Sequence, residues 1–177
     1  ADITVSNDAG TCEAVVIYVA PIGTDNCELP TTNLISGLAS GSTFPIGTTV
    51  VTYQVEDASG NTADCSFNVT VEDTEQPVVT CPADITVDFD VNCEFTLADY
   101  TSGATASDNC SAAGAIALSQ SPAAGTAITA DQVVTITATD EAGNITACTF
   151  NITTQDTTNP TLTCPSDILA STDAGVC

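Results

Sequence analysis

The chain has 177 residues, of which 23 are acidic and none is lysine, arginine or histidine, so its formal net charge is −23. Binding to nucleic acid or to an anionic membrane surface needs basic side chains, and catalysis by histidine or by a Schiff-base lysine needs residues that this chain lacks. We therefore expect no nucleic-acid partner and no catalysis of these kinds. No stretch approaches about 18 consecutive apolar residues, so we expect no membrane insertion. The carboxylates recur at a fixed spacing on predicted turns, which is typical of a scaffold rather than of a paired-carboxylate hydrolase, so we expect no enzymatic activity. Hydrophobic residues make up 43% of the sequence, as in a folded protein.

An internal period of 83 residues organises the sequence. Asp25-Asn26-Cys27 recurs as Asp108-Asn109-Cys110, and Cys65-Ser66-Phe67 recurs as Cys148-Thr149-Phe150. A third start follows, because Cys81-Pro82 recurs as Cys164-Pro165. The repeat predicts two domains at residues 1–76 and 77–159, with residues 160–177 as the first-strand segment of a third repeat.

Alternating apolar and polar residues predict β-strands in each period. In the first period we expect a strand at 13–19, then a hairpin formed by 51–55 and 65–71 around the turn residues 57–61. The second period repeats this pattern at 94–100, 134–138 and 148–152, and proline-containing linkers follow at 72–77 and 155–160. No segment shows helical periodicity. The predicted fold class is all-β, with two tandem immunoglobulin-like β-sandwiches of about seven short strands each.

The combined motifs resemble the hyalin repeat, or HYR, domain. The first copy has Asp25-Asn26-Cys27, Phe44-Pro45-Ile46-Gly47-Thr48, Asp57 to Asn61, and Cys65 with Phe67, whereas the second copy lacks the Phe-Pro-x-Gly motif at 127–130. The resemblance covers essentially the whole chain. It implies immunoglobulin-like modules of extracellular and cell-surface proteins that are associated with adhesion and matrix, and it implies no catalytic role.

Nine cysteines, without histidine and without a Cys-x-x-Cys pair, predict disulfides in an oxidising compartment rather than a zinc site. In the immunoglobulin-like topology implied by the resemblance, the Asp-Asn-Cys loop and the Cys-x-Phe segment lie at the same end of a sandwich. Cys12 is left over, either for a partner just upstream of Ala1 or for a covalent link between subunits. The predicted pairs are Cys27 with Cys65, Cys110 with Cys148, Cys81 with Cys93, and Cys164 with Cys177.

With a net charge of −23, the carboxylates of this chain repel one another, so bound cations would stabilise it. Calcium is the cation that suits a chain offering mainly oxygen ligands. The acidic linker after the first domain is expected to face the Asp108 and Asp140 loops of the second, an arrangement that resembles the calcium-binding joints of cadherins. The alternative is ordinary turn chemistry, in which Asp and Asn bond their own backbone. The predicted calcium ligands are Asp25, Asp57, Glu72, Asp73, Glu75, Asp108, Asp140 and Asp156, with Asn109 as a candidate amide ligand.

Sequons at Asn68, Asn144 and Asn151 predict a glycoprotein. The leading hypothesis is a structural extracellular or cell-surface protein whose partners are copies of itself, joined head to tail in a fibre, filament or stalk. In this hypothesis, segment 160–177 adds a strand to a neighbouring copy. The alternative is an adhesin that binds a glycan or a protein through loops at 28–47 and 111–130, where the two copies differ most.

Overall fold

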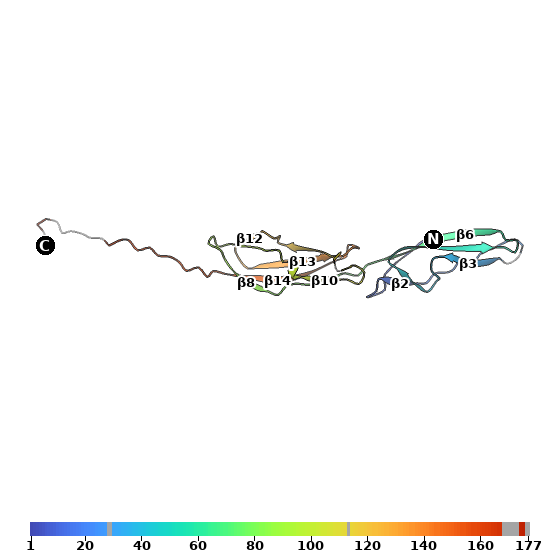
Figure 1. The fold of residues 1–177 in the computed structure, drawn as a ribbon, viewed down its shortest axis with the longest axis horizontal. Coiled ribbons are helices and arrows are strands. Elements are labelled where there is room, and N and C mark those ends of the chain that lie inside the picture. The colour runs from blue at the N-terminus through green and yellow to red at the C-terminus, as the bar shows by residue number, and fades with distance from the viewer. Residues whose placement is uncertain (28–29, 113, 168–173, 176–177) are drawn as a thin grey trace.

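The computed structural model describes residues 1–27, 30–112, 114–167 and 174–175. Figure 1 shows two β-domains arranged end to end, and residues 156–167 lead away from the second domain as an extended segment. Within these described ranges the fold is all-β, with a single 3₁₀ turn at Thr101–Gly103 and no helix long and apolar enough to cross a membrane. The predicted fold class is confirmed.

The first domain is a sandwich of one large and one small sheet. The large sheet has the order β1-β6-β5-β3, and β1 lies parallel to β6 while the other neighbours are antiparallel. The small sheet pairs β2 with β4. The strands are β1 (Ile3–Ser6), β2 (Glu13–Val16), β3 (Thr31–Ser36), β4 (Ser42–Pro45), β5 (Gly47–Glu56) and β6 (Thr62–Glu72).

The core of the first domain lies between these two sheets. Val51 and Val69 point inward from the large sheet because alternate residues of a strand share a face, and Phe44 enters from the small sheet with no exposed surface. The hairpin between β5 and β6 is closed by Asp57, whose Oδ1 accepts hydrogen bonds from the backbone N–H groups of Ser59 and Asn61, each at 2.8 Å. The predicted strand at 13–19 ends earlier, at Val16.

The second domain repeats this plan with one addition. Its large sheet has the order β8-β14-β13-β11, with β8 parallel to β14, and β9 pairs with β12 although the Phe-Pro-x-Gly motif is absent there. The addition is a pairing of β7 with β10. The strands are β7 (Val78–Thr80), β8 (Ile85–Asp88), β9 (Phe95–Thr96), β10 (Thr105–Ser107), β11 (Ala117–Ser121), β12 (Ala127–Ile128), β13 (Gln132–Thr139) and β14 (Ile145–Gln155).

A disulfide joins Cys81, directly after β7, to Cys148 on β14. The predicted pairings of Cys81 with Cys93 and of Cys110 with Cys148 are therefore wrong. The reason is that β7 packs beside β14 and delivers Cys81 to the sheet, whereas Cys93 lies in the turn after β8.

The other predicted pairs are not formed among the described residues. Cys27 and Cys65 are free thiols, which corrects their predicted pairing: Cys65 occupies the position of Cys148, whose partner is the cysteine of a Cys-Pro segment and not that of an Asp-Asn-Cys loop. Cys164 is also free, and its predicted partner Cys177 lies outside the described residues.

Candidate functional site: the acidic joint between the domains

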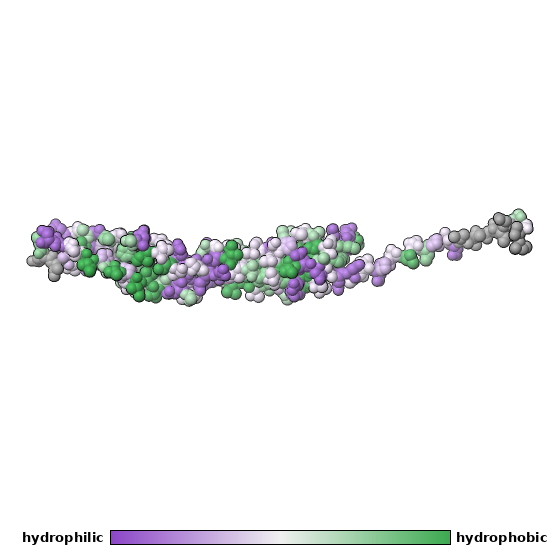
Figure 2. Space-filling view, turned by 180° about the vertical axis from the view of Figure 1, so that it is seen from behind, coloured by the Kyte–Doolittle hydropathy of each residue, from purple (hydrophilic) through white to green (hydrophobic). Residues whose placement is uncertain are grey.

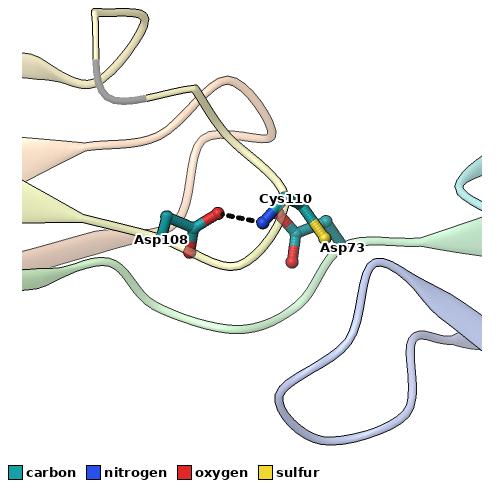
Figure 3. A group of neighbouring side chains, drawn as sticks. All are labelled: Asp73, Asp108 and Cys110. Carbon is teal, nitrogen blue, oxygen red and sulfur yellow. Dashed lines mark hydrogen bonds between the residues drawn. The ribbon is translucent and has the colours of Figure 1, made fainter.

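Two carboxylates and a thiol meet where the chain passes from the first domain to the second. Asp73 follows the end of β6, and Asp108 and Cys110 lie in the loop after β10; one ligand atom from each lies within 4.8 Å of the others (Figure 3). Asp108 is held by its own turn, because its Oδ1 accepts hydrogen bonds from the N–H groups of Cys110 and Ser111, each at 2.8 Å. Its other oxygen, Oδ2, is buried and has no hydrogen-bond partner.

The electrostatics of the joint disfavour further negative charge. Burial raises the pKa of Asp73, and the charges of Asp108, Asp140 and Glu75 raise it further, against a hydrogen bond from the Glu75 backbone. Burial also opposes ionisation of Asp140, but hydrogen bonds from Asn144 hold the pKa of Asp140 below its ordinary value. No basic side chain exists in the sequence to neutralise this group. A cation is therefore the electrostatic complement of the joint.

Hydrogen bonds tie the linker to both domains. Glu75 turns back to the first domain, where its carboxylate accepts bonds from the Gly10 N–H at 2.9 and 3.0 Å and from Asn7 Nδ2 at 3.3 Å. On the other side, Asn144 Nδ2 donates to the Asp73 carbonyl at 3.2 Å, and Asn109 Nδ2 donates directly to the Thr11 carbonyl of the first domain at 2.8 Å. Figure 2 shows hydrophilic side chains gathered where the two domains meet.

The Cys110 thiol faces the first domain within this joint. Its sulfur lies 3.8 Å from the Thr11 carbonyl oxygen and interacts with the side chain of Cys12. Burial, the hydrogen bond to Cys12 and the charge of Asp73 raise the pKa of Cys110 to about 12. Calcium prefers oxygen ligands, so this thiol is not expected to serve as a calcium ligand.

Four of the predicted ligands lie together and four do not. Asp73, Asp108, Asp140 and Glu75 are gathered at the joint, although Glu75 is used by backbone donors of the first domain. Asp25 and Asp57 lie at the opposite end of the first domain, beside one surface hollow with Asn61. Elsewhere, Glu72 is exposed, and Asp156 caps its own turn through the Thr158 N–H at 2.9 Å.

Sequence reasoning missed Asn7 and gave Asn144 a different role. The functional role predicted for Asn144 is that of a sequon, while the 83-residue period also aligns it with the turn residue Asn61 and so marks it as part of the Asp140 loop. Asn7 gives no such signal, because Phe89 stands at the corresponding place in the second repeat. Its side chain bonds Glu75 and accepts from the Thr74 N–H at 3.1 Å, so it belongs to the joint through tertiary contacts alone.

The three sequon side chains donate hydrogen bonds within the chain. Asn68 Nδ2 donates to Asp2, Asn151 Nδ2 donates to Asp84, and Asn144 Nδ2 donates to the Asp73 carbonyl. In each case the nitrogen that a glycan would modify also takes part in holding two segments together. Glycosylation at these sites stays a prediction.

Comparison with known proteins identifies the repeat. The family model of the HYR domain matches residues 2–71 and 72–154. Hyalin from Strongylocentrotus purpuratus is 34% identical over 93% of this chain, and hyalin from Lytechinus variegatus is 36% identical over 98% of it. The chain spans 15% and 33% of the lengths of these two relatives, so it corresponds to a part of each.

Among solved structures, the chain is similar to the EC1-4 fragment of the protocadherin PcdhgB3, with 13% identity and a TM-score of 0.36 over 89% of this chain and 48% of that one. The human desmocollin-1 ectodomain has 11% identity and a TM-score of 0.27 over 87% of this chain and 39% of that one. The family assignment rests instead on the sequence matches, which cover both repeats. The chain belongs to the HYR domain family, a family of extracellular repeat proteins of adhesion type and not of enzymes.

Proposed function

We propose that this chain is a rod-forming segment of an extracellular adhesion or matrix protein, and that its repeats join end to end with further copies of the same repeat. The family supports the extracellular, adhesion-type setting. The end-to-end arrangement of the two domains supports the rod (Figure 1). The repeat of the linker pattern after the second domain supports head-to-tail joining.

The observation that carries this proposal is the way the linker completes the domain that follows it. β7 comes directly after the linker, pairs with β10 and ends at Cys81, which is bonded to Cys148. The same sequence pattern returns after the second domain as residues 161–164, which end at the free and exposed Cys164. Cys65 of the first domain is likewise free and exposed, at the position that corresponds to Cys148. We expect residues 161–164 of one copy to dock on the first domain of a second copy.

The surface of the first domain suits such a strand. Residues 22–24 correspond to β10, yet they form no strand pair of their own, and Ile22 is 87% exposed. Ile17 and Val19 nearby in the sequence are also exposed. An unpaired segment beside exposed apolar side chains is a template for strand addition, in which main-chain hydrogen bonds give affinity and side chains give register.

Head-to-tail joining predicts a covalent bond between Cys164 of one copy and Cys65 of the next. Concentrated chain oxidised by a glutathione redox buffer should form a ladder of oligomers on non-reducing gels, and its dimer band should contain a Cys65–Cys164 cross-linked peptide. Cys164→Ser and Cys65→Ser should each remove that peptide, whereas Cys12→Ser should leave it. A chain that stays monomeric at millimolar concentration, with both thiols unbonded, would contradict the proposal.

We further propose that the joint binds calcium, which would stiffen the rod. The residues present fit this ion: Asp73 and Asp108 supply carboxylate oxygens, and the buried Asp108 Oδ2 has no other partner. Burial is the main cause of the raised pKa of Asp73, and the charges of Asp108, Asp140 and Glu75 add to it; a bound cation would offset those charges. The ion would add oxygen coordination between the linker and the second domain, and so limit bending at the joint.

Calcium should therefore raise the melting temperature, and a chelator should reverse the effect. At a calcium concentration about 100 times the dissociation constant, linkage gives about 2.7 kcal/mol of added stability. Asp108→Asn should abolish the shift, whereas Asp25→Asn, the same change at the corresponding loop of the first domain, should preserve it. The measurement is differential scanning calorimetry at fixed ionic strength. If Asp25→Asn abolished the calcium-induced rise in melting temperature as fully as Asp108→Asn, or if sodium produced the same rise, the effect would be charge screening and not calcium binding at the joint.

A further inference from the structure

Cys12 and Cys110 are unbonded thiols in the structure, and we infer that oxidation joins them in a disulfide that locks the two domains together at their joint. Cys12 lies in the turn between β1 and β2 of the first domain, and Cys110 lies in the loop after β10 of the second. The Cys110 sulfur is 3.8 Å from the carbonyl oxygen of Thr11 and interacts with the Cys12 side chain. The neighbouring Asn109 donates to the same Thr11 carbonyl at 2.8 Å, which holds the two loops in contact.

Neither cysteine has an alternative partner within its own domain. In the second domain, the turn that contains Cys93 lies beside the end of β14, where the Phe89 N–H donates to the Gln155 carbonyl. The Cys110 loop lies beside the other end, where the Glu141 N–H donates to Ser111 Oγ. β14 has 11 residues, so at about 3.3 Å per residue these ends are roughly 35 Å apart. A disulfide needs Cα atoms within about 7 Å.

The first domain gives the same result. The turn that contains Cys12 is near the end of β6, because the Asn7 N–H donates to the Glu72 carbonyl there. Cys27 is near the β5–β6 turn at the other end, beside Asp57. Cys65 lies on β6 seven residues before Glu72, which at about 3.3 Å per residue is roughly 23 Å from the Cys12 end of that strand. The second repeat therefore has one internal disulfide, Cys81–Cys148, the first repeat has the free Cys65 at the position of Cys148, and each repeat has one further cysteine at each end. The end cysteines are placed to bond across joints and not within domains.

The bond forms by thiol–disulfide exchange with a low-molecular-weight disulfide such as oxidised glutathione. Cys12 is exposed, so its sulfur attacks the small disulfide and releases one small thiol. The Cys110 sulfur then attacks the Cys12 sulfur and releases the second small thiol. Two protein thiols are oxidised, one small disulfide is reduced to two thiols, and no atom is left over.

Disulfide mapping of the whole chain tests the inference. Trypsin is useless because the chain has no lysine or arginine, but cleavage before aspartate places all nine cysteines on separate peptides, with Cys12 on residues 8–24 and Cys110 on residues 108–130. The chain is oxidised with glutathione, blocked with N-ethylmaleimide, cleaved without reduction and analysed by mass spectrometry. We expect these two peptides to be linked to the same extent as the peptides of Cys81 and Cys148.

Variants and an internal standard define the outcomes. In Cys12→Ser, Cys110 should become fully alkylated, whereas Cys93→Ser should leave the link intact. Alkylation of both Cys12 and Cys110 in a sample where Cys81–Cys148 is fully oxidised would overturn the inference, as would a link of either residue to another cysteine. Within the proposed head-to-tail assembly, on which this extension rests, Cys93 of one copy would bond Cys27 of the next. Loss of only that intermolecular link would count against the assembly and leave the Cys12–Cys110 bond standing.

Discussion

Replacing both Cys81 and Cys148 with serine should lower the free energy of unfolding of the second domain by about 4 kcal/mol. The disulfide closes a loop with a sequence separation of 67, and the loop-closure entropy of a ring of this length gives that figure at 25 °C. The two sulfurs also pack against the apolar core of this domain, so a single replacement would leave one half-buried thiol without its partner. The double variant avoids that complication.

Urea unfolding followed by circular dichroism measures the effect. Urea is preferable to guanidinium because the salt would screen the repulsion of a chain with a net charge of −23. Reduction of the parent chain should reproduce the loss, and reduction of the double variant should add nothing at this site. Cys93→Ser removes an exposed free thiol and should leave the midpoint unchanged in dilute solution. Equal stability of the parent and the double variant would show that the loop is already constrained without the bond.

The hairpins were predictable because their residues alternate over a long stretch. Val51, Tyr53 and Val69 alternate with polar residues along β5 and β6 and are all buried, and a period of two admits no other regular structure. The same reasoning failed at the short strand β9, which was predicted to span residues 94–100 and has two residues. Only two residues of β9 pair with β12. The alternation of apolar and polar residues did not predict where β9 ends, because Leu97 and Tyr100 beyond it are apolar through packing in the core and not through strand pairing.

The disulfide pairing was not predictable because spacing says nothing about which strand lies beside which. The predicted pairing of Cys81 with Cys93 followed from the assignment of Cys148 to Cys110, but β7 packs beside β14 and brings Cys81 to Cys148, at a sequence separation of 67. The acidic joint was easier to predict from the sequence, because Asp73, Asp108 and Asp140 follow strand ends and recur with the repeat. What remained hidden was the set of donors that fix the joint, such as Asn7, whose contacts depend on how the linker turns.

Phe44→Ala should destabilise the first domain by about 3–5 kcal/mol, the usual range for removing a buried phenylalanine and leaving a cavity. Phe44 has no exposed surface and lies among side chains of both sheets, including Val51 and Val69. Tyr18 packs edge-on against it with ring centroids 6.5 Å apart, and the Tyr18 hydroxyl is held by the Leu38 carbonyl at 2.6 Å. With that ring held, we expect the core to close only partly around the cavity.

The second domain supplies the comparison: the buried residue of its short β9–β12 pair is Ile128, which lies opposite Phe95 as Phe44 lies opposite Ala14, and its large buried aromatic ring is that of Phe150, which is 2% exposed. Phe150→Ala should lower the free energy of unfolding by a similar amount, with the effect confined to the second domain. Val19→Ala is the control: this side chain is 92% exposed, so its removal should change the free energy of unfolding by less than about 0.5 kcal/mol. Amide hydrogen exchange assigns each loss to a domain, since protection in β5 should fall in the first variant and protection in β14 in the second. Should Phe44→Ala weaken protection equally in β5 and β14, the two cores would unfold as one unit, and the joint would be far more strongly coupled than its hydrogen bonds alone suggest.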